Sequence, residues 1–107
     1  MTSIEARNKR VGLHLPLNVS GRDVLGAPFA EATRTVNVSG GGLCFETRQK
    51  LGIGSRITLH IEVPEPMRRH FRGQAVYRVR AVVCRVERFE GQALARLGAR
   101  FVAEIDD

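Results

Sequence analysis

The clearest chemistry in this chain is offered by Asn37 and Ser39, two short polar side chains that precede the glycines Gly40, Gly41 and Gly42. Residues two apart on an extended backbone face the same side, so both polar groups are expected to point in one direction. Glycines let a chain turn sharply and leave its amides accessible. The stretch predicts a strand that runs into a turn and presents an amide and a hydroxyl together, a pair suited to binding a polar ligand.

A second candidate group is a cluster of cations ahead of the first predicted strand. Arg7, Lys9 and Arg10 place three positive charges within four residues. Alone, such a cluster is typical of a solvated basic terminus. Considered with Asn37 and Ser39, it could instead close over an anionic ligand, because an arginine fork matches phosphate and the guanine edge better than a lysine point charge does.

Enzyme and metal chemistry have little support in the sequence. The histidines His14, His60 and His70 are scattered, and Ser39 lacks the Gly-x-Ser-x-Gly pattern of a nucleophile turn. The glycine run has neither the spacing nor the lysine of a phosphate-binding loop. Cys44 and Cys84 are the only cysteines, and both are expected to be buried thiols in apolar strands. No catalytic residue, metal site or cofactor is therefore predicted.

Strands dominate the predicted elements, since apolar residues alternate with polar ones in most segments. An alternation that slips between Ala81 and Val82 predicts a bulge in the fifth strand. Residues 67–73 are expected to form a basic loop, and no segment longer than ten residues has a sustained helical pattern. The predicted strands are residues 13–19, 29–38, 43–47, 57–63, 75–89 and 97–102. Strands with glycine turns imply an all-β fold, and at this length a closed barrel is favoured over a sandwich because it leaves the fewest edges.

Length and composition agree with one globular domain. The chain has 107 residues, 43% of them hydrophobic, so a single domain over residues 1–107 with its core at about 10–103 is expected. No apolar run approaches the roughly 20 residues of a membrane span, and no secretion signal begins the sequence, so a cytoplasmic location is expected. A net charge of +6, carried mostly by arginine, favours an anionic partner.

At this point the sequence resembles the PilZ domain, a bacterial receptor module for cyclic di-GMP. That family has an Arg-x-x-x-Arg motif ahead of its first strand and an Asp/Asn-x-Ser-x-x-Gly motif at the end of a later strand. Asn37 to Gly42 matches the second motif in full, and Leu43 is the apolar residue that follows it. Arg10 stands at the second arginine of the first motif. The resemblance extends over residues 7–103 and implies a six- to seven-stranded antiparallel β-barrel with a flexible N-terminal arginine segment.

The resemblance also implies a ligand and a set of residues that bind it. Cyclic di-GMP would be bound by Arg7, Arg10, Asn37, Ser39 and Gly42, with support from Lys9, Gly40 and Gly41. One position departs from the family, because Ala6 stands where the first arginine is expected and Arg7 would have to replace it. The implied function is a bacterial second-messenger receptor that changes conformation on binding and signals to a protein effector.

Two alternatives remain open at the level of sequence. A PilZ-like domain with a degenerate arginine motif could act as a protein-interaction adapter without binding nucleotide, and the Arg-x-x-Arg spacing favours that alternative. A small RNA-binding barrel would fit the basic charge, but aromatic residues make up only 6% of the chain and no aromatic pair is placed to stack bases. Neither DNA, RNA nor a membrane is predicted as a partner.

Overall fold

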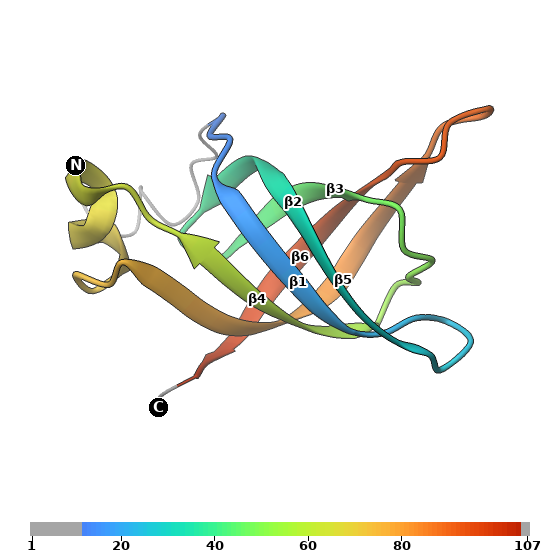
Figure 1. The fold of residues 1–107 in the computed structure, drawn as a ribbon, viewed down its shortest axis with the longest axis horizontal. Helices are drawn as coiled ribbons and strands as arrows, with labels where there is room; N and C mark the ends of the chain where they lie inside the picture. Colours follow the sequence, from blue (N-terminus) through green and yellow to red (C-terminus); the bar gives the residue numbers. More distant parts are fainter. Residues whose placement is uncertain (1–11, 106–107) are drawn as a thin grey trace.

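The computed structural model describes residues 12–105 of the chain as a closed barrel of six antiparallel strands, shown in Figure 1. The strand order around the barrel is β1-β2-β3-β6-β5-β4, and pairing of β1 with β4 closes it. The predicted all-β antiparallel barrel is confirmed, with six strands. They are β1 (Pro16–Arg22), β2 (Pro28–Ser39), β3 (Gly42–Thr47), β4 (Arg56–Glu62), β5 (Val76–Arg88) and β6 (Ala95–Glu104).

The interior of the barrel is filled by the alternating apolar residues that predicted the strands. On β1, Leu17 and Val19 are buried, and they pair across the closing seam with Ile61 and Leu59 of β4. Pro16 is exposed at the first residue of β1, a position where the missing N–H is tolerated. Successive side chains on a strand face opposite sides, so this core leaves the intervening polar residues on the outer surface.

The predicted bulge in the fifth strand exists, but it lies later in the strand than the sequence indicated. Inward-facing residues continue as Val79, Ala81 and Val83, all of which are buried. The register with β6 shifts between Val83 and Arg85, with a further shift between Arg80 and Ala81. The expectation that Val82 would be an inward position is therefore wrong, because the alternation does not slip until after Val83.

The same bulge explains a wrong prediction about the cysteines. Cys84 lies within the shifted register and is exposed, whereas the sequence predicted that it would be buried. Its thiol lies 3.5 Å from the carbonyl oxygen of Gly98, to which it is a weak donor. Cys44 is buried, as predicted. Both are free cysteines.

A short 3-10 helix, η1 (Glu65–Phe71), replaces most of the predicted basic loop. Pro64 and Pro66 favour its start because their fixed φ suits the first turn of a helix. The chain leaves the helix through Arg72, which has φ 57° and whose N–H bonds back to the carbonyl oxygen of Arg68. Phe71 is buried in the core cluster and makes an edge-to-face contact with Tyr77, so the helix is fixed to one end of the barrel.

Candidate functional site

A bulge in β2 determines which way the candidate polar pair faces. Thr35 pairs with Phe45 of β3, but Asn37 pairs with the adjacent Cys44, so Val36 is an extra residue in β2. Before the bulge the inward position is Thr35, which is only 1% exposed; after it the buried residue is Val38. A one-residue slip reverses the facing of every later side chain. Half-buried Asn37 and Ser39 therefore share the outer face of the barrel, beside the start of the turn.

The turn between β2 and β3 is held partly by the hydroxyl of Ser39. Gly40 and Gly41 connect the strands, and Ser39 is the Cα partner of Gly42 across the turn. The Ser39 Oγ accepts a hydrogen bond from the Gly41 N–H at 3.3 Å and donates to the Gly42 carbonyl oxygen at 3.3 Å. Both bonds are long, and a hydroxyl oxygen has two acceptor positions. The hydroxyl can therefore exchange these contacts for bonds to a ligand without leaving a strong bond unmade.

Gly42 has a packing role that the sequence did not indicate. A Cβ at this position would overlap the carbonyl oxygen of Ala99 on β6, so only glycine lets β3 lie so close to that strand. The Gly41 carbonyl oxygen also accepts a hydrogen bond from the N–H of Phe101 at 2.9 Å. The turn is thus fixed to β6 as well as to its own two strands.

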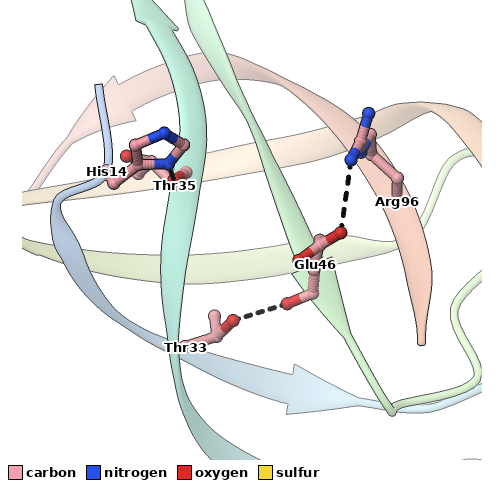
Figure 2. A network of polar contacts seen from close by, with 5 residues as sticks. All are labelled: His14, Thr33, Thr35, Glu46 and Arg96. Carbon is pink, nitrogen blue, oxygen red and sulfur yellow. Dashed lines mark hydrogen bonds and ion pairs between the residues drawn. The ribbon is translucent and has the colours of Figure 1, made fainter. Parts of the chain in front are cut away.

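The segment that leads into β1 is attached to β2 immediately before the polar pair. The Thr35 hydroxyl accepts a hydrogen bond from the Leu15 N–H at 2.8 Å and donates to the Leu13 carbonyl oxygen. The Thr35 N–H donates to the Leu15 carbonyl oxygen at 2.9 Å, and Figure 2 shows the ring of His14 beside the Thr35 carbonyl oxygen at 3.2 Å. Because the two segments run antiparallel, residues that precede Leu15 lie beside the part of β2 that leads to Asn37.

The three N-terminal site residues, Arg7, Lys9 and Arg10, lie outside the described residues. The described structure nevertheless shows where the chain that carries them joins the barrel. Leu13 is held against Thr35, two residues before Asn37, so the described chain enters the barrel at the same end as the polar pair.

Two ion pairs neutralise other charges further along the outer face. Arg96 of β6 pairs with Glu46 of β3 at 3.3 Å, and Figure 2 shows Thr33 donating to the Glu46 carbonyl oxygen at 2.6 Å. On β5, Arg85 lies 3.7 Å from Glu87. Both pairs are partly exposed, so each contributes little to stability. Their main consequence is that these two arginines already have anionic partners.

The arginines around η1 make local contacts. Arg68 donates from Nε to the Val63 carbonyl oxygen at 3.1 Å. Arg72 pairs with Glu104 of β6 at 3.1 Å. These contacts attach the helix and the residue after it to the ends of β4 and β6.

Thr35 is the residue of the site that sequence reasoning missed. Its signal was weak, because the polar residues Thr33, Thr35, Asn37 and Ser39 form an unbroken alternating series. Nothing in that series marks Thr35 as inward and Asn37 as outward.

Within residues 12–105, no three potential metal ligands come together, and no helix there is long and apolar enough to cross a membrane.

Comparison with known proteins agrees with the barrel fold. The sequence model of the PilZ domain matches residues 5–107. A search of curated protein sequences finds no significant match. Among solved structures, the inhibitor of motility MotI (DgrA) of Bacillus subtilis is similar with a TM-score of 0.67 and 16% identity, over 90% of this chain and 42% of that one.

Two further structures are isolated PilZ domains. The PilZ domain of CesA from a cellulose-synthesizing bacterium has a TM-score of 0.57 and 17% identity, over 94% of this chain and 84% of that one. The PilZ domain of YcgR from Escherichia coli, solved with cyclic di-GMP, has a TM-score of 0.57 and 16% identity, over 88% of this chain and 75% of that one. This chain thus spans most of an isolated domain but about two fifths of MotI. A family match over nearly the whole chain, together with the shared barrel, shows that the chain belongs to the PilZ domain family.

Proposed function

We propose that this chain is a receptor for cyclic di-GMP, and that the nucleotide binds between the arginine segment at residues 7–10 and the turn at residues 37–42. The observation that carries the proposal is the bulge at Val36. It turns Asn37 and Ser39 to the outer face beside the point where the arginine segment joins the barrel. Membership of the PilZ family, and the similar YcgR domain solved with cyclic di-GMP, support the same ligand.

Each proposed residue has a role that its chemistry allows. Arg10 and Arg7 offer planar forks that match the O6 and N7 acceptors of guanine and the oxygens of phosphate. Lys9 adds charge without a fork. Asn37 can donate and accept, so it can bind a second base edge, and Ser39 can donate to a base or a phosphate.

The glycines of the turn divide into two roles. Gly40 and Gly41 let the ligand approach the backbone without a Cβ in the way, and so support the site. Gly42 keeps the turn against β6, since a side chain there would overlap Ala99. The position of Ser39 therefore depends on Gly42, even if Gly42 makes no hydrogen bond to the ligand itself.

The proposed contacts are sufficient for a useful affinity. Hydrogen bonds to charged groups contribute roughly 1.5–3 kcal/mol each, and a micromolar complex needs about 8 kcal/mol. Two arginine forks with the Asn37–Ser39 pair reach that range after the cost of ordering the side chains. Loss of one fork lowers affinity by about one to two orders of magnitude.

We further propose that binding changes the conformation of the arginine segment and that the altered surface signals to a protein effector. Cyclic di-GMP is a bacterial intracellular messenger, so the receptor would act in the bacterial cytoplasm. The similar MotI is named as an inhibitor of motility. The effector of the present chain would be a protein that binds it only in the presence of the nucleotide. Identifying that protein would show which process the chain regulates.

The direct test is titration calorimetry of the purified chain with cyclic di-GMP, with GMP as a control ligand. The expected result is saturable heat with a dissociation constant in the micromolar range and no comparable heat from GMP. Absence of heat at tens of micromolar, in a protein that shows a cooperative melting transition, would rule out the receptor function.

A nucleotide-independent adapter is the second candidate, and the observation that favours it is Ala6 at the position of the first arginine. This candidate keeps the same barrel and uses its surface to bind a protein. It predicts that a folded wild-type chain gives no heat with cyclic di-GMP. It also predicts that effector binding, once an effector is known, is the same with and without the nucleotide.

A further inference from the structure

We propose that Arg100 of β6 is an additional ligand-binding residue that contacts a phosphate of the nucleotide bound at the β2–β3 turn. This inference rests on the proposed function and extends the same site across β3 onto β6. It assigns a binding role to a residue that lies 61 positions after Ser39 in the sequence and belongs to neither motif.

The strand register places Arg100 in line with the polar turn. Ser39 of β2 is the Cα partner of Gly42, and Gly42 is the Cα partner of Arg100. The flanking residues on β6 face the core, since Ala99 is buried and Phe101 packs against the core cluster. Arg100 therefore points to the outer face and is exposed, as the alternation of a strand requires. Ser39 and Arg100 stand on the same face of the barrel with one strand between them.

Gly42 leaves no side chain between Ser39 and Arg100 on the outer face. The middle strand contributes no side chain in this row, and an added Cβ at Gly42 would lie 3.3 Å from the Cα of Arg100. The backbone hydrogen bond from Phe101 to Gly41 fixes the turn and β6 at this spacing. Two strand spacings separate Ser39 from Arg100, about 10 Å. A phosphate group together with an extended arginine side chain spans that gap.

Arg100 is also an exposed cation with no ion pair among the described residues. Further along the outer face, Arg96 and Arg85 are paired with Glu46 and Glu87. Among residues 12–105, no carboxylate pairs with Arg100, and its other strand neighbour is Val82. A phosphate can therefore bind Arg100 without breaking an existing ion pair, and a charge-assisted bond to phosphate is stronger than a neutral one.

This assignment accounts for how the site can function with alanine at position 6. The arginine motif lacks one fork in its usual register, and a cation supplied by the barrel would replace part of the lost phosphate contact. Arg100 is carried by a hydrogen-bonded strand, so little backbone ordering is required when it engages the ligand.

The test compares Arg100→Gln and Arg100→Lys with the wild-type chain by titration calorimetry with cyclic di-GMP at low and moderate salt. We expect Arg100→Gln to weaken binding about tenfold, because it loses one charge-assisted contact. Arg100→Lys should retain part of the affinity. The loss caused by Arg100→Gln should shrink as salt is raised, because ions screen an exposed contact.

Arg48→Gln is the matched control. Arg48 is exposed just beyond the far end of β3, about 20 Å from Gly42, and its substitution removes the same charge. It should leave the affinity unchanged, and all three variants should melt at the wild-type temperature. Two results would overturn the role of Arg100 and leave the proposed function standing. In the first, the wild type binds and the affinity of Arg100→Gln is within about twofold of it. In the second, Arg48→Gln loses as much affinity as Arg100→Gln. Absence of wild-type binding overturns both.

Discussion

The hydroxyl of Thr35 accepts a hydrogen bond from the backbone N–H of Leu15 at 2.8 Å, and this bond joins β2 to the segment that precedes β1. The same hydroxyl donates to the Leu13 carbonyl oxygen. The buried Thr35 hydroxyl thus provides hydrogen-bond partners for two backbone groups where the pairing of β1 with β2 begins. The consequence is that the chain leading from the arginine segment is fixed two residues away from Asn37.

Replacement of this hydroxyl should destabilise the protein. Thr35→Val keeps the shape of the side chain but leaves the Leu15 N–H and the Leu13 carbonyl without their partner. We expect a loss of about 1–3 kcal/mol in the free energy of unfolding, measured by urea denaturation. Thr58→Val on β4 is the control, because Thr58 is half-buried and carries the same chemical change. Equal stability losses in the two variants would contradict the anchoring role of Thr35.

Gly42 should be intolerant of even a methyl group. Gly42→Ala places a Cβ against the Ala99 carbonyl oxygen, so β3 and β6 must move apart. We expect a destabilisation of about 1–3 kcal/mol, as for other overpacked positions, seen as a lower melting temperature. Gly52→Ala is the matched control, since the nearest atom to its added Cβ is a Val24 methyl carbon at 3.8 Å. A melting temperature for Gly42→Ala equal to that of the control would show that the close approach is unimportant.

The register of the arginine motif can be tested by restoring it. Ala6→Arg recreates the Arg-x-x-x-Arg spacing with Arg10, and it should raise affinity for cyclic di-GMP by about tenfold through one added charge-assisted contact. If Arg7 replaces the missing residue, Arg7→Ala should weaken binding in the wild-type background and have less effect in the Ala6→Arg background. An Arg7→Ala variant that binds as the wild type does would remove Arg7 from the site.

Tyr77 provides a pH-dependent test of the packing at η1. Burial raises the pKa of its phenol, the nearby Glu104 carboxylate raises the pKa further, and Arg72 acts in the opposite direction. The phenol lies in an edge-to-face row between Phe71 and Phe101. A pKa raised by folding means that the folded chain holds this proton more tightly than the unfolded chain does. The stabilisation is complete below the unfolded pKa of about 10 and is lost as pH rises through the folded pKa.

The measurement is direct because Tyr77 is the only tyrosine and the chain has no tryptophan. Absorbance at the tyrosinate band should titrate at higher pH in the native protein than in concentrated urea. Tyr77→Phe should remove this contribution to the loss of stability above about pH 10. Coincident titrations in the native and denatured states would contradict the packing described for this end of the barrel.

Strands with one buried face were predictable, whereas the points at which strands change phase were not. Residues 57–63 alternate cleanly, and β4 forms there because that alternation matches the period of a strand. The bulge at Val36 depends on pairing with Phe45 and Cys44, which are distant partners invisible to a local pattern. Val82 and Val83 are both apolar, so the sequence could not decide which of them faces the core. The wrong prediction that Cys84 is buried follows from that ambiguity.

The residues of the candidate site also fall into two groups, those predictable from the local sequence and those whose role depends on the assembled barrel. Asn37 and Ser39 could be predicted as a pair, because their spacing and the following glycines are local features. The contributions of Thr35, Gly42 and Arg100 arise only when β1, β3 and β6 are assembled around β2. A short 3-10 helix at residues 65–71 also escaped prediction, since one or two turns leave too few residues to establish a helical period.

The central claim is that the arginine segment and the β2–β3 turn form one nucleotide site. The most direct measurement is titration calorimetry of Arg10→Ala and Ser39→Ala with cyclic di-GMP, beside the wild-type chain and with melting curves for each. The account predicts that both variants remain folded and that each binds at least about tenfold more weakly than the wild type. If the wild type binds and neither variant binds more weakly, the ligand occupies another part of the barrel and the site described here is wrong.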